Sequence, residues 1–276
     1  MMMTSLLLAA ALSAKFDGVA GYSAINLDTG KRASVNGDVR FPMASVFKLP
    51  AAIAVLQKVD RGEWSLDQKI TITPAEFSRG WSPIRDAAHG EAVTLPLREM
   101  FVYMLGSSDN SAVDKFFAML GGPSRVTKVL ESLGIQGIRV DRKEDEVGRD
   151  AMADMLAYSR DPRDTATPDG MADLLRLIYQ RKEKLSPASH NLLLAVMEQS
   201  PTGPHRLREV IPAGAVLAHK TGSMPGTAND AGIVMTLDGK SRVAIAVFTK
   251  GSTMSEEERD AVVRELAQEA WEKVTR

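Results

Sequence analysis

Apolar and polar positions alternate near both ends of this chain in a pattern typical of β-strands. Asp238-Gly239 separates the last two alternating runs and favours a two-residue hairpin turn between them. The expected strands cover residues 19–27, 32–35, 215–222, 230–237 and 241–248. The pattern therefore predicts an antiparallel sheet to which both ends of the chain contribute.

Between these runs, apolar residues recur at the spacing typical of helices. Glycines and prolines bound several of the runs, and Ser186 is placed to cap one of them just before Pro187. A further amphipathic run closes the chain over 255–274, where Ser255 and Glu258 form a capping box. The other expected helices cover residues 45–60, 96–104, 110–120, 123–133, a run that begins near Pro168, and 186–199.

Strands at both ends with helices between them predict an α+β fold. We expect an antiparallel sheet built from both termini, flanked by N- and C-terminal helices, with an inserted all-helical domain. Residues 1–40 and 198–276 would form the α/β domain, and residues 41–197 would form the inserted helical domain. An active site would then lie in the crevice between the two domains.

The apolar segment 5–14 leaves two interpretations open. Its composition fits the apolar region of a secretory signal, but no basic residue precedes it, because Lys15 is the first. The segment is also too short to span a bilayer. These features favour a buried first helix that ends near residues 16–18 and predict no stable membrane association.

Charge and composition exclude several classes of function. Lys+Arg 34 against Asp+Glu 35 gives a formal net charge of −1, without a basic stripe that interleaves with aromatic residues, so nucleic acid is not an expected partner. The absence of cysteine excludes disulfides and thiolate chemistry. The 4 histidines are scattered without the spacing of a zinc site. We therefore expect no metal and no cofactor.

Ser45 and Lys48 stand three positions apart where an apolar run begins, so on a helix they share a face. A partly desolvated lysine has a lowered pKa and can take the proton of a neighbouring serine hydroxyl. Backbone N–H groups at a helix start can also stabilise a developing oxyanion. Such a pair is expected about once by chance in a chain of this length, so by itself it also fits an ordinary helix start.

Two further motifs follow in order, Ser108-Asp109-Asn110 and Lys220-Thr221-Gly222. Each tripeptide would occur by chance in roughly a few per cent of chains of this length. Together with Ser45-x-x-Lys48, they resemble the motif set of class A serine β-lactamases and, more distantly, of the penicillin-binding peptidases. The resemblance implies hydrolysis of β-lactam antibiotics, and hence antibiotic resistance, through an acyl-enzyme.

The resemblance extends to a segment that is similar to the family's Ω loop. "DRKEDEVG" at 141–148 resembles the part that carries a catalytic glutamate, which falls on Glu144, and "RDTATP" at 163–168 resembles the far end. Arg142 and Asp164 match the pair that bridges the neck of the loop, a structural role. The resemblance thus predicts an Ω-like loop over 141–168.

The resemblance implies a role for each catalytic residue. Ser45 attacks the lactam carbonyl, and the backbone N–H groups of Ser45 and Ser223 form the oxyanion hole. Lys48, or Glu144 acting through a water, removes the serine proton; the two assignments remain open. Ser108 passes a proton to the departing ring nitrogen, with Lys220 holding it in place. The residues expected to bind substrate are Trp81, Asn110, Arg206, Thr221, Gly222 and Ser223; Arg206 is inferred from its position 14 before Lys220.

Glu144 separates the hypotheses about function. β-Lactamases and penicillin-binding peptidases share acylation, but only the lactamases need a base that activates water against the acyl-enzyme. The alternatives are a D-alanyl-D-alanine peptidase, an acyl-trapping penicillin-binding protein, or a non-catalytic module that binds lactams or peptidoglycan. The substrates suggest a periplasmic or secreted protein, and we expect a monomer whose partners are small β-lactam molecules.

Several residues depart from the family pattern. Gly148 stands where an asparagine usually helps to hold the hydrolytic water, and His219 stands where we expect an acidic residue. Glu144 and Asp164 are 20 positions apart, more than the usual loop requires, so the segment 148–162 bulges or adds helix. "AMADMLAY" has helical spacing, with Met152, Met155 and Leu156 available for one apolar face. The longer loop predicts room for bulky oxyimino cephalosporins.

Overall fold

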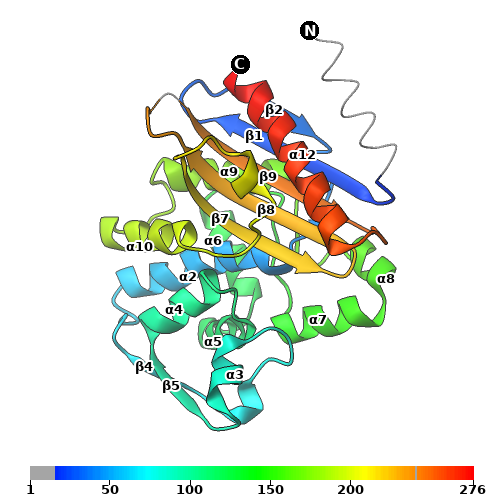
Figure 1. Ribbon diagram of the computed structural model, residues 1–276. Helices are drawn as coiled ribbons and strands as arrows, with labels where there is room; N and C mark the ends of the chain where they lie inside the picture. Colours follow the sequence, from blue (N-terminus) through cyan, green and yellow to red (C-terminus); the bar gives the residue numbers. More distant parts are fainter. Residues whose placement is uncertain (1–15, 240) are drawn as a thin grey trace.

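A five-stranded sheet lies at the centre of the upper half of the molecule (Figure 1). The computed structural model describes residues 16–239 and 241–276. The sheet has the order β2-β1-β9-β8-β7, and every neighbouring pair is antiparallel. Its strands are β1 (Val19–Asn26), β2 (Arg32–Val35), β7 (Val216–Met224), β8 (Thr227–Met235) and β9 (Arg242–Lys250). Because β1 pairs with β9, the two ends of the chain share one sheet, and the predicted fold class is confirmed.

The two faces of the sheet bury different sets of side chains, as expected from the alternation of side chains along a strand. On β9, Val243, Ile245 and Val247 pack into a core beneath α12 (Glu256–Thr275), whereas the intervening residues face the larger core shared with the helices. The predicted capping box of α12 is confirmed, because Ser255 and Glu258 exchange backbone-to-side-chain hydrogen bonds of 2.8 and 3.2 Å.

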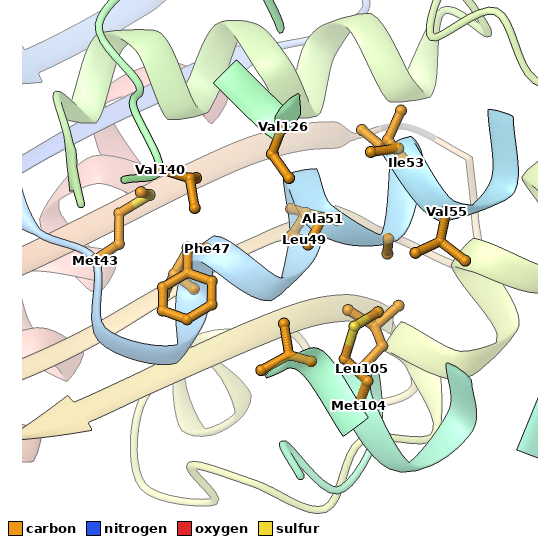
Figure 2. Close-up of a cluster of buried hydrophobic side chains, with 14 of the residues drawn as sticks. Met43, Phe47, Leu49, Ala51, Ile53, Val55, Met104, Leu105, Val126 and Val140 are labelled. Atoms are coloured by element: carbon orange, nitrogen blue, oxygen red, sulfur yellow. The ribbon is translucent and has the colours of Figure 1, made fainter. Parts of the chain in front are cut away.

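Helix α2 (Lys48–Asp60) runs through the middle of the helical part of the molecule, and residues 48–57 are all buried. A helix that is apolar on all sides is one that other elements surround. Figure 2 shows Leu49 and Val55 of α2 in one apolar cluster with Met104 and Leu105 of α4 (Leu97–Leu105). This core holds the N-terminal end of α2, which carries Lys48, in a fixed position.

Some of the remaining helices surround α2, some lie against the sheet, and the others form the outer part of the helical region (Figure 1). They are η1 (Ala44–Phe47), η2 (Pro74–Glu76), α3 (Pro83–Ala88), α4 (Leu97–Leu105), α5 (Asn110–Leu120), α6 (Ser124–Ser132), α7 (Glu144–Ala153), α8 (Met155–Arg160), α9 (Pro168–Tyr179), α10 (Pro187–Glu198) and α11 (Leu207–Val210). Ser186 caps α10 as predicted, because its hydroxyl accepts the N–H of Ser189. In the described part of the chain, no helix is both long enough and apolar enough to cross a membrane.

The structure differs from the sequence-based expectations in three respects. The helical part also contains the strand pairs β4 (Lys69–Ile72) with β5 (Val93–Pro96) and β3 (Phe41–Pro42) with β6 (Thr165–Ala166). The first turn of the expected helix 45–60 is the 3₁₀ turn η1. β8 ends at Met235 and β9 begins at Arg242, so the connection is longer than a two-residue turn. The expected first helix in segment 5–14 lies outside the described residues.

Candidate active site

The candidate nucleophile Ser45 lies in η1, between the sheet and the helical core. Ala44, directly before it, has a left-handed φ of 46°, a conformation that is strained for a residue with a Cβ. Two contacts impose this conformation: the Met43 N–H donates to the Asp164 carbonyl at 2.9 Å, and Asn229 of β8 donates to the Met43 carbonyl at 3.0 Å. The backbone before Ser45 is therefore held from both sides.

Lys48 lies one turn further on, and its ammonium group is completely buried. Its Nζ donates to the Ser45 hydroxyl at 2.9 Å, to the Ser108 carbonyl at 2.7 Å and to the Asn110 amide oxygen at 2.5 Å. Burial lowers the pKa of Lys48, while the nearby Glu144 carboxylate acts in the opposite direction. A lysine with a lowered pKa that touches the serine oxygen can accept its proton.

Ser108 is held between two buried lysines. Its hydroxyl accepts from Lys220 Nζ at 3.0 Å and from Lys48 Nζ at 3.2 Å. Burial lowers the pKa of Lys220 well below its ordinary value, and the charge of Lys48 lowers it further. Ser108 itself has a left-handed φ of 61°, a second strained residue in the site. The three side chains, from three distant segments, form one connected path for a proton.

Strand β7 passes directly beside the nucleophile. A Cβ added to Gly222 would lie 2.5 Å from the Met43 carbonyl oxygen and 3.0 Å from the Ser45 nitrogen, so only glycine allows this approach. The next residue, Ser223, is exposed at the mouth of the site. Thr221 donates its hydroxyl to Thr202 at 2.7 Å. This edge of the strand brings Ser223 to the same cavity that Ser45 lines.

Arg206, which precedes β7 in the sequence, joins the same edge. Its guanidinium is 2% exposed and donates to the Ser223 hydroxyl at 2.6 Å and to the Asn229 carbonyl at 2.9 Å. Asp260 of α12 accepts from its Nε at 2.8 Å. The position inferred from spacing alone therefore places the guanidinium beside the Lys220-Thr221-Gly222 motif.

Trp81 and Asn110 lie on the opposite wall. The indole of Trp81 is 63% exposed, and its Nε1 donates to the Ser107 carbonyl at 2.9 Å, which fixes the ring at the mouth of the pocket. Asn110 is buried at the start of α5. Asp109 caps that helix by accepting the N–H of Ala112 at 2.8 Å, which is a structural role.

Glu144 begins α7 and points into the site. Its Oε1 accepts from the Ser45 hydroxyl at 3.5 Å and lies 3.8 Å from Lys48 Nζ. The sequence-based search missed Asp114, whose carboxylate accepts the N–H of Glu144 at 2.7 Å and that of Asp145 at 3.2 Å. Burial raises the pKa of Asp114 to about 7. Its place one helical turn after Asn110 on the same face of α5 was the signal that could have identified it.

The neck of the predicted Ω-like loop is closed by Arg142 and Asp164. Arg142 Nε donates to Asp164 Oδ2 at 2.6 Å, and the backbone N–H groups of Asp141 and Arg142 donate to the other carboxylate oxygen. Arg142 also donates to Asp150 at 2.7 Å, inside the loop. Because the Asp164 carbonyl accepts the N–H of Met43, the neck of the loop is hydrogen-bonded to the segment directly before Ser45.

The long loop adds helix, as expected, but without the expected apolar face. Asp154 ends α7 and caps α8, so "AMADMLAY" is split between two helices. Met152 and Leu156 are 76% and 48% exposed, and only Met155 packs inward, against Gly226. The prediction of a single apolar stripe was wrong because the break at Asp154 rotates the two halves relative to each other.

His219 has a buried carboxylate partner on the neighbouring strand. Its Nδ1 lies 2.9 Å from Asp230 Oδ1, and its Nε2 lies 3.2 Å from the guanidinium of Arg208. Asp230 also accepts the N–H of Leu207 at 3.2 Å. The acidic group that we expected at position 219 is thus supplied by β8, and it anchors α11 behind Lys220.

Part of this set lines a cavity of about 730 Å³, whereas Lys48 and Lys220 are not in its lining. Ser45, Ser108, Glu144, Thr221 and Ser223 are at its floor and walls, and Trp81, Met152 and Met224 contribute apolar surface. Over residues 16–239 and 241–276, no group of three or more His, Cys, Asp or Glu side chains is arranged to hold a metal ion.

Comparison with known proteins identifies β-lactamases as relatives over almost the whole chain. The model of the β-lactamase enzyme family matches residues 7–274. The extended-spectrum β-lactamase PER-1 of Pseudomonas aeruginosa is 34% identical over 86% of this chain and 77% of its own length. β-Lactamase VEB-1 of the same organism is 31% identical over 92% and 84%. The crystal structure of a β-lactamase from Chitinophaga pinensis has a TM-score of 0.86 and 36% identity, with 98% of each chain covered.

The chain therefore belongs to the β-lactamase enzyme family. The resemblance to class A serine β-lactamases is confirmed, and the protein is an enzyme that hydrolyses β-lactams.

Proposed function

We propose that this enzyme opens the β-lactam amide through an acyl-enzyme on Ser45. The observation that carries the proposal is the contact of the Ser45 hydroxyl with Lys48 Nζ at 2.9 Å and with Glu144 Oε1 at 3.5 Å. Ser45 Oγ attacks the lactam carbonyl carbon while its proton passes to Lys48, or to Glu144 through a water. Backbone N–H groups of Ser45 and Ser223 stabilise the resulting oxyanion.

Ring opening then needs a proton on the departing nitrogen. Ser108 supplies it, and Lys220, 3.0 Å away, together with Lys48 compensates the charge that develops on the serine oxygen. Glu144 afterwards removes a proton from the water that attacks the acyl-enzyme, and Ser45 leaves with its own proton restored. Asp114 holds the backbone of Glu144 and so keeps the carboxylate directed at Ser45.

The remaining candidates bind the substrate. Thr221, Ser223 and Arg206 form a polar and positively charged edge suited to the carboxylate that penicillins and cephalosporins carry. Asn110 offers an amide to the acyl side chain, and Trp81 covers its outer face. Gly222 lets the substrate approach the backbone of β7. Arg142 and Asp164 hold the loop that carries Glu144, and the chemistry uses no metal and no cofactor.

A chromogenic cephalosporin tests the proposal. We expect continuous turnover, with colour formed far in excess of the enzyme concentration, because Glu144 is placed to release the acyl group. A single stoichiometric burst would instead identify an acyl-trapping penicillin-binding protein or a slow peptidase. No reaction would identify a binding module, and either of these two results would overturn the proposal.

The cellular setting follows from the substrates. We propose that the enzyme acts as a monomer on small β-lactam molecules in the periplasm or outside the cell, where these drugs are met first. We also propose that it accepts bulky oxyimino cephalosporins. This is supported by the long loop and by the glycine at position 148; PER-1, one of the relatives, is named an extended-spectrum enzyme.

We expect Gly148→Asn to speed the hydrolysis of small penicillins by about 3- to 10-fold, the effect of about one added hydrogen bond to the attacking water. Position 148 follows Glu144 by one helical turn on α7, so the new amide would point the same way as the carboxylate. Within the described residues, a Cβ at Gly148 would meet no heavy atom within 4 Å.

Pre-steady-state kinetics checks this expectation. The amplitude of the acyl-enzyme burst should fall in Gly148→Asn, because deacylation is the step that improves. Gly148→Ala is the matched control, since it adds a side chain without an amide and should leave the burst unchanged. Equal gains in both variants would show that helix stability, and not the water contact, is responsible.

A further inference from the structure

Helix α7 presents a row of residues to the cavity at intervals of one helical turn. Glu144, Gly148 and Met152 are each four positions apart, so they share one face of the helix, and all three line the cavity. A rise of about 1.5 Å per residue places Met152 about 12 Å along the axis from Glu144. The row starts at the candidate base and ends at an apolar thioether.

The middle of this row is open. A Cβ at Gly148 would meet no heavy atom within 4 Å among the described residues, so the helix surface between Glu144 and Met152 is a shallow trough. An acyl group that reaches from Glu144 to Gly148 covers about one helical turn, roughly 6 Å along the helix axis. An acyl group that also contacts Met152 must cover about two turns. A long substituent can therefore lie along α7 without displacing protein atoms.

Met152 is an apolar side chain in an exposed place. It is 76% exposed yet lines the cavity, and Trp81, which is 63% exposed, lines the same cavity from the opposite wall. Exposed apolar groups that gather at a pocket mouth indicate a surface for a ligand. Leu156, at 48% exposure, is also apolar, but it lies on α8 and is not part of the cavity wall.

We propose that Met152, together with Trp81, forms a distal subsite that selects β-lactams with long acyl side chains ending in an apolar group. The proposal rests on the proposed function, because the acyl chain is taken to start beside Ser45 and Asn110. Methionine suits this task because its unbranched, polarizable side chain adapts to ligands of different shape. The contact comes from the part of the loop that is longer than the family pattern.

A pair of penicillins that differ only in the length of a straight alkyl acyl chain tests the proposal. We expect the wild-type enzyme to favour the octanoyl over the butanoyl derivative in kcat/KM, by about 2- to 4-fold for each added methylene that becomes buried. Met152→Ala should lower kcat/KM for the octanoyl substrate by about 3- to 10-fold and leave the butanoyl substrate within about 2-fold. Met152→Leu should restore most of the preference.

Leu156→Ala is the matched control, since it removes a similar exposed apolar side chain outside the cavity, and it should change neither substrate. An equal loss for both substrates in Met152→Ala, no loss for either, or the same effect in Leu156→Ala would overturn the distal subsite. Failure of the wild-type enzyme to turn over even the butanoyl substrate would instead overturn the proposed function. Because both side chains are exposed, both variants should unfold at the wild-type temperature. A change in kcat/KM would then not come from a folding defect.

Discussion

Replacing Ser45 with alanine is expected to abolish covalent labelling by benzylpenicillin and to lower turnover by about 10⁴-fold or more, because the attacking oxygen is gone. The fold should persist, since Lys48 keeps hydrogen bonds to the Ser108 carbonyl and to Asn110. Mass spectrometry of the intact protein after mixing measures the result directly. The wild-type chain should gain the mass of one penicillin, and the variant should gain none.

Ser107→Ala is the control for this experiment. Ser107 lines the same cavity, but no lysine Nζ is hydrogen-bonded to its hydroxyl in the described structure, so its variant should still be labelled. An adduct on Ser45→Ala, or an adduct mapped to another serine of the wild-type chain, would contradict the assignment of the nucleophile.

Replacing Glu144 with alanine is expected to trap the acyl-enzyme. Loss of a general base slows water attack by about 10²- to 10⁴-fold, whereas opening of the strained ring can still use Lys48, 2.9 Å from the Ser45 oxygen. The acylated form should therefore dominate during steady-state turnover. Rapid quenching followed by mass spectrometry measures the acylated fraction, and stopped-flow absorbance gives the two rates separately.

Asp145→Ala tests whether another carboxylate of the cavity wall can act as the general base in deacylation. Asp145 also lines the cavity, but its carboxylate accepts the backbone N–H of Arg79 and has no hydrogen bond to Ser45 among the described contacts. The Asp145 variant should deacylate normally. Undiminished turnover of benzylpenicillin by Glu144→Ala would show that Glu144 is not the base, and the reason for preferring a lactamase mechanism to peptidase chemistry would then be lost.

Much of the fold could be predicted because local pattern determines local structure. The alternation of β1 and β9, the capping box of α12 and the proline that opens α10 each depend on a few neighbouring residues. Features set by contacts between distant segments were missed. The pairing of β3 with β6 sets Phe41 opposite Ala166, a contact that no short window of sequence contains.

The contrast between local sequence pattern and contacts of distant segments also applies to the site. Ser45 and Lys48 lie three positions apart, so their contact follows from helix geometry alone. The two contacts of Asp114 depend on how α5 packs against the start of α7, because they are made with backbone N–H groups 30 and 31 positions away. His219 likewise acquires its carboxylate partner from the register of β7 with β8, which sets Asp230 beside the motif strand.

The sequence by itself determined the fold class, the order of the three motifs and the candidate residues for the chemistry, because these depend on residue type and short spacing. Only the tertiary structure decided that Lys48 and Lys220 share the Ser108 hydroxyl, that Asp114 holds Glu144, and that Met152 faces the cavity instead of a core. The physical reason is that burial and hydrogen-bond partners arise where distant segments pack together, and neither is a property of any one segment.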